Sequence, residues 1–479
     1  MNLYDIRHEP NMLQARRQFL KTGMGLGLPT LASLLPQNVM ARQAPGHAPK
    51  AKRVIFLFMA GAPSHIDLFD YKPGLNEQFR KPLPESISQG QRVTAMTRGA
   101  TQLVCPSKFK FHRRGKNGLW MSELLPHLGE VADDLCLIKS MHTNAINHDP
   151  GKTFICTGSE IPGNASMGAW LSYGLGTMNR DLPDFVVLNS AYWTGGTRNT
   201  QALYSRLWGN GFLPSKHQGV AFQTSGDPVL FLSNPNGVDA RVRRRMLDAI
   251  GEVNRKHYGE IGDQEIQTTI AQQEMAFRMQ ASVPELTNID EEPENVMDLY
   301  GPEVKKAGSF ARNCLLARRM VERGVRFIQV FHRGWDHHSI LPKQLPGQCF
   351  DVDQPSAALI RDLKQRGLLD DTIIVFAGEF GRTVYGQGKL ERDDYGRDHH
   401  PRCFTAWMAG GGIKGGISYG ETDDFAYNVA HNPVSVRDLH ATMLHQLGID
   451  HDKLTFPFQG LDQKLTGVEP ARVVKEILS

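Results

Sequence analysis

Short apolar runs recur along the chain, and they predict the strands of one sheet. Most of the runs are continuous, which is typical of parallel strands that are covered on both faces, and one of them alternates. Gly, Pro or polar residues bound each run. The predicted strands are Val54–Met59, Leu135–Ile138, Phe185–Leu188, the alternating Val325–Phe331, Thr372–Phe376 and Cys403–Met408.

Helical patterns separate these runs. Strands that alternate with helices favour an α/β fold, so we expect a three-layer α/β/α sandwich with a mostly parallel sheet over residues 53–479, with a helical insertion at about 240–320. Residues 70–114 are rich in Pro, Lys and Gln and are expected to lie outside the core. The predicted helices are Trp120–Leu128, Ala357–Arg366, Val436–Leu447 and a segment from Ala240 to Val321 that prolines interrupt.

One stretch, His148–Gly158, combines a helix start with ionisable side chains. Asp149 before Pro150 predicts an N-cap followed by the first helical residue, and Gly158 can end the helix. The N-terminus of a helix carries free N–H groups and partial positive charge, so His148 and Lys152 could face an anion there. The alternative is a capped surface helix whose polar side chains are solvated.

Polar clusters also follow other predicted strands. Ligands of a parallel α/β sheet bind beyond the carboxyl ends of its strands, and Asp and His are common ligands of divalent metals. Ordinary turns and hydrogen bonds within loops are the alternative explanation. The clusters are Ser64, His65 and Asp67; His332–His338; Glu379 and Arg382; and Asp398–His400 in a loop.

Arg198 lies in the Gly- and aromatic-rich segment Ala191–Asn199. This segment is either a loop that binds a sugar or an anion, or a Gly-rich loop that only covers the structure beneath it.

The N-terminus predicts export. Arg16-Arg17-Gln18-Phe19-Leu20-Lys21 precedes a Gly- and Leu-rich segment that ends near Ala41, which is typical of a twin-arginine signal. We therefore expect a signal peptide at 1–41, a linker at 42–52, the twin-arginine translocase as an export partner, and a periplasmic or secreted protein. The apolar segment is too short and too rich in Gly for a good membrane span, so no stable membrane anchor is expected.

The amino-acid composition says little about which kinds of molecule the protein binds. The 479 residues include 54 basic and 50 acidic ones, and the net charge of +4 is too mild to argue for a nucleic-acid partner. The six cysteines form no Cys-x-x-Cys pair. Cys156 and Cys314 are predicted as buried thiols, whereas Cys349 and Cys403 are predicted in loops, where a disulfide is possible but unsupported.

Several motifs resemble the alkaline phosphatase and sulfatase superfamily. His148–Lys152, followed after four residues by Thr157-Gly158, has the spacing of the sulfatase nucleophile motif, with Lys152 where sulfatases have Arg. Arg366–Phe376 is similar to the segment before a sulfatase metal-binding motif, and Asp438–Leu444 to a late helix. Within the superfamily the chain resembles an exported twin-arginine family of undefined function, often described as sulfatase-like, through Gly61–Asp67, Gly334–His338, Gly378–Thr383 and Asp398–Pro401.

The sequence departs from sulfatases at the positions that matter for their chemistry. Gly61 and Ala62 stand where sulfatases have paired Asp ligands, and Phe380 follows Glu379 where they have Asn after Asp. His148 stands at the nucleophile position. Because histidine cannot become formylglycine, the alignment excludes the formylglycine route.

Two functions remain. The resemblance implies either a metal-dependent hydrolase of phosphate or sulfate esters, for example on glycans, or a catalytically degenerate protein that binds an anionic glycan or envelope component. The expected ligand is an anionic small molecule or polysaccharide in both cases. For the hydrolase, the candidates are His148 (nucleophile or proton shuttle), Lys152 and Arg382 for catalysis; Asp67, Asp336, His338, Glu379, His399 and His400 for a divalent metal (Zn, Ca, Mg or Mn); and Ser64, His65, Asn147 and Arg198 for substrate contact.

Overall fold

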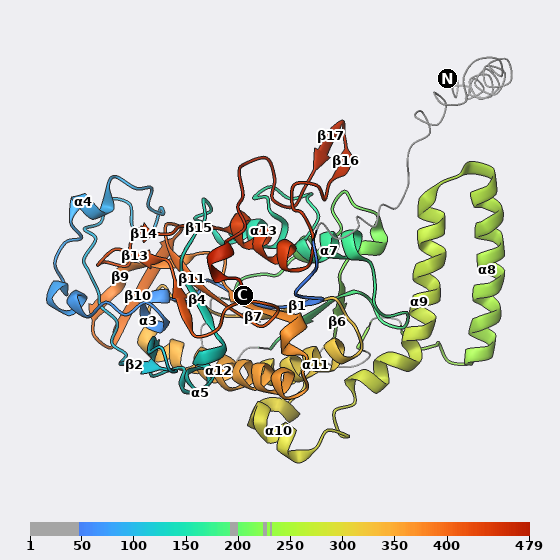
Figure 1. The fold of residues 1–479 in the computed structure, drawn as a ribbon, viewed down its shortest axis with the longest axis horizontal. Coiled ribbons are helices and arrows are strands. Elements are labelled where there is room, and N and C mark those ends of the chain that lie inside the picture. Colours follow the sequence, from blue (N-terminus) through green and yellow to red (C-terminus); the bar gives the residue numbers. More distant parts are fainter. Residues whose placement is uncertain (1–46, 192–199, 224–227, 230–231) are drawn as a thin grey trace, which may run out of the picture. The chain divides into compact units, whose positions relative to one another are not determined.

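A nine-stranded sheet forms the centre of the fold (Figure 1). The computed structural model describes residues 47–191, 200–223, 228–229 and 232–479. The strand order is β12-β4-β11-β8-β1-β7-β5-β6, with β15 paired to β4, and only β11 runs antiparallel to its neighbours within this described sheet. This mostly parallel sheet confirms the predicted fold class. Its strands are β1 (Arg53–Ala60), β4 (Cys136–His142), β5 (Phe185–Asn189), β6 (Val220–Phe222), β7 (Phe327–Arg333), β8 (Thr372–Ala377), β11 (Phe404–Ala409), β12 (Ile417–Tyr419) and β15 (Val434–Ser435).

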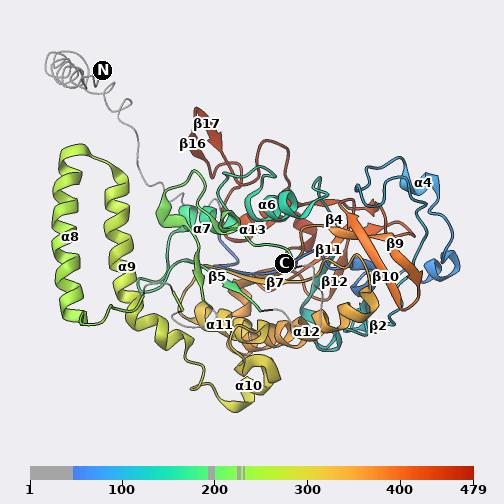
Figure 2. The ribbon, with the colours of Figure 1, turned by 180° about the vertical axis from the view of Figure 1, so that it is seen from behind.

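Helices cover both faces of the sheet and complete three layers (Figures 1 and 2). In β1, Leu57 and Met59 belong to one buried cluster, whereas Phe56 and Phe58 belong to the other. Successive side chains of a strand point to opposite faces, so cover on both faces requires the continuous apolar runs seen in the sequence. One layer contains α6 (His148–Thr157), α7 (Met167–Leu175) and α13 (Val436–Gln446); the other contains α5 (Pro126–Glu130), α11 (Phe310–Glu322) and α12 (Leu341–Gln365).

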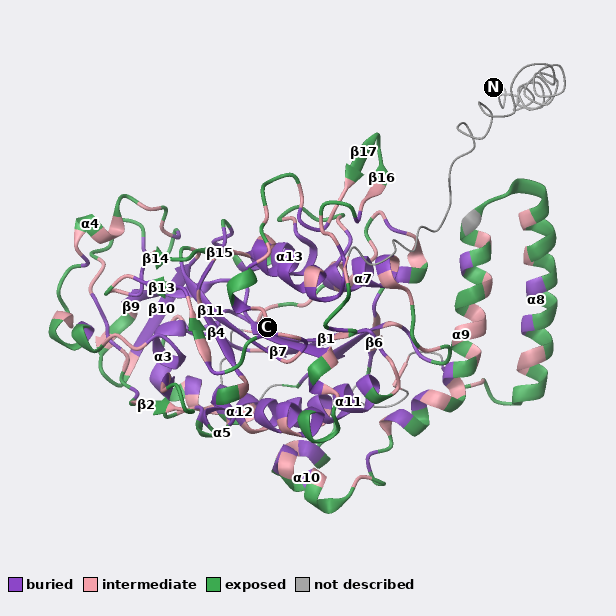
Figure 3. Ribbon diagram, viewed as in Figure 1, coloured by how far each residue is buried: buried purple, intermediate pink, exposed green. Residues whose placement is uncertain are grey.

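Residues 240–300 are mostly helical and lie largely outside these layers. In α8, most residues are exposed, and Figure 3 shows this contrast with the buried sheet. Among the described residues, no helix is both long and apolar enough to span a membrane. The helices here are α8 (Ala240–Ile261), α9 (Gln264–Thr287) and α10 (Glu294–Tyr300); elsewhere lie the short α3 (His65–Leu68) and α4 (Glu85–Ser88).

Four two-stranded sheets and several 3-10 turns complete the described part of the chain. The pair β9 and β10 matters most, because β10 contributes to the candidate site described below. The pairs are β2 (Phe111–Arg114) with β3 (Leu119–Ser122), β9 (Gly381–Glu391) with β10 (Asp394–His400), β13 (Glu421–Thr422) with β14 (Val429–His431), and β16 (Phe456–Phe458) with β17 (Leu461–Gln463); the 3-10 turns are η1 (Pro73–Gln78), η2 (Ala132–Asp134), η3 (Ser205–Trp208), η4 (Ser215–His217), η5 (Pro302–Lys305), η6 (Leu369–Asp371) and η7 (Lys475–Ile477).

Two of the predicted elements are wrong. Trp120–Leu128 is not one helix, because Leu119–Ser122 pairs with β2 as a strand and a new helix begins only at Pro126. Asp398–His400 is not a loop but the end of β10, which pairs with β9. In both cases the segment forms a hairpin with the strand that precedes it, β2 or β9, and its own hydrophobic pattern did not indicate this pairing.

Two helices differ from their predicted bounds. The N-cap of α6 is Asn147 rather than Asp149, since the first turn of a helix tolerates Pro150 beyond its first position. Gly158 ends α6 with φ +74°, as predicted. The last helix before β8, α12, begins at Leu341, well before the predicted start, and contains Pro342 in its first turn and two prolines in its interior.

The cysteines follow their expected burial only in part. All six are free and buried, as predicted for Cys156 and Cys314. Cys349 lies inside α12, so its predicted place in a loop is wrong, whereas Cys403 lies in the connection between β10 and β11, as predicted, although it is buried there. No disulfide joins them.

Buried histidines predict a loss of stability in acid. Burial lowers the pKa of His217 and of His440 to about 4. Between pH of about 6.5 and 4 the unfolded chain binds protons that the folded chain excludes, so the free energy of unfolding falls as the pH falls, by about 3 kcal/mol for each residue at the acid end. Urea unfolding at pH 7 and pH 5 measures this difference. It should be smaller in a His440→Gln variant, and equal stability at both pH values in the native protein would contradict the expectation.

Candidate metal centre

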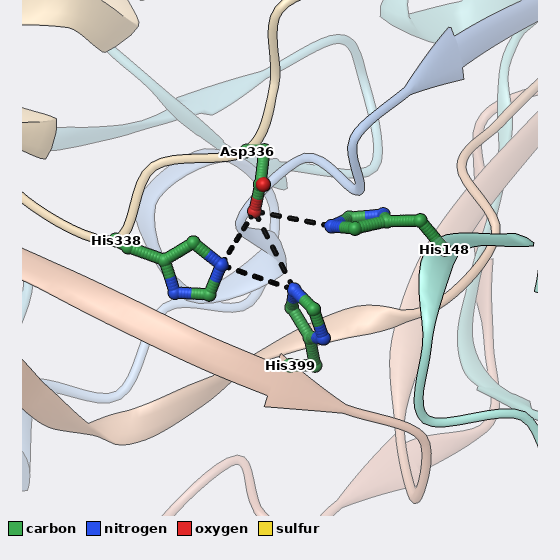
Figure 4. A group of neighbouring side chains, drawn as sticks. All are labelled: His148, Asp336, His338 and His399. Atoms are coloured by element: carbon green, nitrogen blue, oxygen red, sulfur yellow. Dashed lines mark hydrogen bonds and ion pairs between the residues drawn. The ribbon is translucent and has the colours of Figure 1, made fainter. Parts of the chain in front are cut away.

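Four ionisable side chains converge at the carboxyl edge of the sheet (Figure 4). His148 begins α6 after β4, Asp336 and His338 follow β7, and His399 lies in β10. Their ligand atoms all lie within 4.8 Å of one another. The centre of the group is Asp336 Oδ1, which lies 3.1 Å from Nε2 of His148, 2.8 Å from Nε2 of His338 and 3.5 Å from Nε2 of His399.

Each of the three imidazoles is fixed through its other nitrogen. Every Nδ1 faces an oxygen that can only accept a hydrogen bond, so in the neutral ring Nδ1 carries the proton and Nε2 keeps its lone pair. The three contacts are His148 Nδ1 to Glu379 Oε1 at 2.6 Å, His338 Nδ1 to Gln387 Oε1 at 2.6 Å, and His399 Nδ1 to the carbonyl oxygen of Ile146 at 2.9 Å.

The Nε2 lone pairs of the three histidines therefore point toward the centre of the group and lie close to one another. Nε2 of His338 and Nε2 of His399 are only 3.1 Å apart. Nε2 of His148 is buried and lies near Asp336, but it makes no hydrogen bond of acceptable geometry. Such a group is stable only with a cation or a shared proton at its centre. Three imidazole nitrogens and one carboxylate oxygen, each imidazole held by an acceptor, form a donor set that fits a divalent transition metal.

The protonation states of Asp336 and His399 suit metal binding. Burial alone would raise the pKa of Asp336, but Arg382 and the three histidines hold it well below its usual range. Burial lowers the pKa of His399 to about 4. Burial also opposes protonation of His148, although its contacts with Asp336 and Glu379 outweigh burial and raise its pKa. Asp336 is thus an anion and His399 a neutral imidazole near neutral pH, which are the forms that bind metals.

Arg382 and Glu379 support the group from the protein side. Arg382 is fully buried, and its Nη2 lies 2.7 Å from Asp336 Oδ1 while its Nε donates to the carbonyl oxygen of Ala62 at 3.0 Å. Glu379 accepts hydrogen bonds from the Gly61 N–H at 3.0 and 3.2 Å in addition to its contact with His148. Arg382 therefore contacts the same oxygen of Asp336 that the imidazoles face, and Glu379 lies behind His148, so these two residues orient the ligand candidates.

Gly61 allows the close approach of this loop, and its substitution gives a prediction. Gly61 has φ +113°, and a Cβ there would lie 2.7 Å from the backbone nitrogen of Asp336. A Gly61→Ala variant should lose about 1 to 3 kcal/mol of stability through backbone strain. Displacing Asp336 should also weaken metal binding, measured by competition with a chelator. Gly74→Ala is the control, because nothing lies within 4 Å of a Cβ there, and equal metal affinity in both variants would contradict the expectation.

Three of the predicted metal ligands lie outside the group: Glu379, which contacts Nδ1 of His148 from behind, and also Asp67 and His400. Asp67 is fully buried and pairs with Arg397, whose Nε lies 2.7 Å from Asp67 Oδ2, and it also accepts a hydrogen bond from Ser64 at 2.5 Å. His400 is buried and its Nε2 lies 2.6 Å from the carbonyl oxygen of Tyr427. The side chains of Asp67 and His400 are thus engaged by groups other than the four that converge.

The remaining residues that were predicted for catalysis or substrate contact lie outside the group of four side chains. Lys152 is buried and donates from Nζ to the carbonyl oxygen of Ala202 at 2.5 Å, and burial lowers its pKa against the attraction of Glu379 and Asp149. His65 is buried, with Nε2 3.2 Å from the carbonyl oxygen of Ala426. Asn147 is exposed at the N-cap of α6, and Arg198 lies outside the described residues.

Two glutamines belong to the site and were not predicted. Gln387 fixes His338, and Gln201 donates from Nε2 to Asp336 Oδ2 at 2.9 Å. Gln387 lies in a polar stretch whose sequence did not predict a strand. Gln201 follows the segment Ala191–Asn199, in which Arg198 was the predicted contact residue. No feature of the sequence marked either amide as a partner of a distant side chain.

The chain matches one protein family, and it is distantly similar in structure to several solved proteins. No curated protein matches the chain. Among solved structures, a sulfatase from Pseudoalteromonas sp. is 12% identical, with 92% of this chain and 72% of that chain covered and a TM-score of 0.32. A protein in the alkaline phosphatase superfamily from Vibrio parahaemolyticus is 12% identical, with coverage of 85% and 68% and a TM-score of 0.35. A phosphonate monoester hydrolase from Silicibacter pomeroyi is 14% identical, with coverage of 74% and 71% and a TM-score of 0.30.

TM-scores of this size carry no argument about the site or its chemistry. The family is established separately, by a family model that matches residues 51–478 and includes all four converging side chains. The chain therefore belongs to the family described as protein of unknown function (DUF1501).

Proposed function

We propose that this chain is an exported hydrolase of phosphate or sulfate esters that depends on one divalent cation bound by His148, Asp336, His338 and His399. The observation that supports it most is the set of three Nε2 lone pairs turned toward one carboxylate oxygen, each fixed by an acceptor on Nδ1. Imidazole-rich sites prefer zinc and other transition metals, whereas calcium and magnesium prefer oxygen ligands. We therefore expect zinc.

The chain's own residues supply a place for the ester's negative charge. A divalent cation bound in the group would polarise the ester and lower the pKa of a water molecule. The first N–H groups of α6 have no partner within the helix, and the Asn147 side chain does not cap them. Lys152 lies one turn further along α6 and has further N–H groups beyond the one given to Ala202. The ester's anionic oxygens would lie against this helix start.

The geometry changes the role that we propose for His148. Its Nε2 faces Asp336 and the other ligands, and its Nδ1 is bonded to Glu379. A nitrogen that binds a metal has no lone pair left for attack on an ester. We therefore assign His148 to the ligands rather than to a nucleophile, and the attack to water.

A second candidate function rests on the same geometry. Four protein ligands complete a tetrahedral set, as they do in structural zinc sites, whereas catalytic sites keep an open position. The buried Asp67 is also neutralised by Arg397, so it is not free to act. On this reading the chain binds an anionic glycan or envelope component and does not cleave it.

Hydrolysis of aryl esters separates the two candidates. The purified chain is loaded with zinc and assayed with 4-nitrophenyl phosphate and 4-nitrophenyl sulfate, then again after chelation and after zinc is restored. The hydrolase predicts turnover of at least one ester that is lost on chelation and recovered with zinc. Zinc bound in stoichiometric amount without turnover of either ester would overturn the hydrolase and favour the binding protein.

Export is proposed from the N-terminal motif alone. A twin-arginine substrate crosses the membrane through its translocase only with both arginines in place. Replacing Arg16 and Arg17 with lysine should therefore retain the protein in the cytoplasm, measured by cell fractionation and immunoblotting. Unchanged delivery to the periplasm or medium would contradict this route.

A further inference from the structure

A cavity lies apart from the four converging side chains. It has a volume of about 550 Å³, within the range of small-molecule sites, and lies between α3, η1, β2 and the turn that joins β9 to β10. Figure 1 shows α3, β2, β9 and β10 gathered at one end of the domain. None of His148, Asp336, His338 and His399 lines it. The cavity is therefore a separate place where a ligand could bind.

The floor and walls of the cavity are apolar and aromatic. Ile66, Leu75 and Phe109 are buried in it. Tyr71 and Phe111 stack with their ring centres 5.0 Å apart and an interplanar angle of 22°. A sugar ring packs its polarised C–H bonds against the negative face of an aromatic ring, and Tyr71, Phe79, Phe109 and Phe111 all line the cavity, so its aromatic lining suits a saccharide.

The rim of the cavity is cationic. Lys72, Lys108, Lys110 and Arg392 line it, and Asp393 is the only carboxylate among the described lining residues. Lys72 also lies 3.6 Å from Asp70 and donates to the carbonyl oxygen of Thr422. Lys108 already pairs with Asp393. Lys110 and Arg392 are exposed and form no ion pair with any described carboxylate. A ligand that suits both the walls and the rim is a sugar with an anionic group.

The hairpin of β9 and β10 connects this cavity to the metal centre. Arg392 and Asp393 form its turn, and His399 pairs with Arg382 at its other end. The rise from Asp394 to His399 is about 17 Å. One ligand could occupy both places only if it were a chain of several units.

We propose that the cavity is a binding site for an anionic oligosaccharide, which holds sugar units at a distance from the ester. Its coupling to ester cleavage rests on the proposed function, but binding in the cavity does not. The site would select polymeric over small substrates.

Calorimetric titration of the full chain tests the proposal. The probes are a sulfated hexasaccharide prepared from heparin and the same hexasaccharide after desulfation. The test variant combines Lys110→Gln with Arg392→Gln, and the control combines Arg241→Gln with Lys256→Gln on α8, which changes the net charge equally. The test variant should raise the dissociation constant of the sulfated probe roughly three- to tenfold, and the control should leave it nearly unchanged. The desulfated probe should bind more weakly.

Two results would overturn the proposal. One is an equal dissociation constant in the test and control variants. The other is binding of octyl phosphate that depends on Lys110 and Arg392 when the hexasaccharide does not bind, which would assign the cavity to an amphipathic anion instead.

The titration also separates this proposal from the proposed function. Binding of the hexasaccharide should persist in a His338→Ala chain, because His338 does not line the cavity. Turnover of an aryl ester without hexasaccharide binding would remove the cavity proposal alone. Binding that depends on Lys110 and Arg392 in a zinc-loaded chain that cleaves no ester would remove the hydrolase alone.

Discussion

Replacing His338 with alanine should abolish stoichiometric zinc binding and, with it, ester turnover. His338 is the most exposed of the four ligand candidates, with 18% of its side chain accessible, so its loss leaves the core intact. The remaining set would lack one nitrogen donor, and Asp336 would lose its closest imidazole, which lies 2.8 Å away. We expect the affinity for zinc to fall by at least about 100-fold, since even the loss of a supporting partner of a ligand costs 10- to 100-fold. Competition with a fluorescent chelator measures the affinity.

A histidine elsewhere on the surface provides the control. His257 is exposed on α8, and His257→Ala should leave zinc binding and turnover unchanged. The thermal stability of the His338→Ala chain without metal should match that of the metal-free native chain. Equal zinc affinities of the His338→Ala and native chains would remove His338 from the ligand set.

Replacing Asp67 with asparagine should destabilise the fold and leave zinc bound. Burial alone would raise the pKa of Asp67, but Arg397 and Ser64 keep it below its usual value, so the carboxylate is charged. The side chains of Asp67 and Arg397 are both fully buried, and the substitution would leave the guanidinium without a counter-charge. Loss of one partner of a buried ion pair costs about 3 to 5 kcal/mol. Urea unfolding measures the loss, and metal analysis measures the zinc.

The matched control is the same substitution in an exposed ion pair. Asp393 pairs with Lys108 at the surface, where 75% of its side chain is accessible, so Asp393→Asn should change stability little. A native-like stability for Asp67→Asn together with loss of zinc would identify Asp67 as a metal ligand, as first predicted from the sequence.

The central strands could be predicted because strands that are buried on both faces consist of apolar residues. β1 and β8 are covered on both faces, and each therefore reads as an uninterrupted apolar run. β10 is buried as well, but its residues are mostly charged or polar, and their partners lie in β9 and at Asp67. A polar strand that is stabilised by distant ion pairs resembles a loop in the sequence.

The same limit explains which site residues could be predicted. Asp336 and His338 follow a recognisable strand, and both belong to the converging group. His399 and His400 were equivalent candidates as long as they were placed in a loop. In a strand, neighbouring side chains point to opposite sides, so only His399 faces Asp336 while His400 contacts Tyr427. Once β10 is known to be a strand, this choice follows.

Anomalous X-ray diffraction from zinc-loaded crystals of the chain, recorded on both sides of the zinc absorption edge, would locate the metal. We expect one strong zinc peak at about 2.0 to 2.1 Å from Nε2 of His148, His338 and His399 and at a similar distance from an oxygen of Asp336. No peak among these four side chains in zinc-loaded crystals, or a peak bound instead by Asp67 or His400, would contradict this expectation.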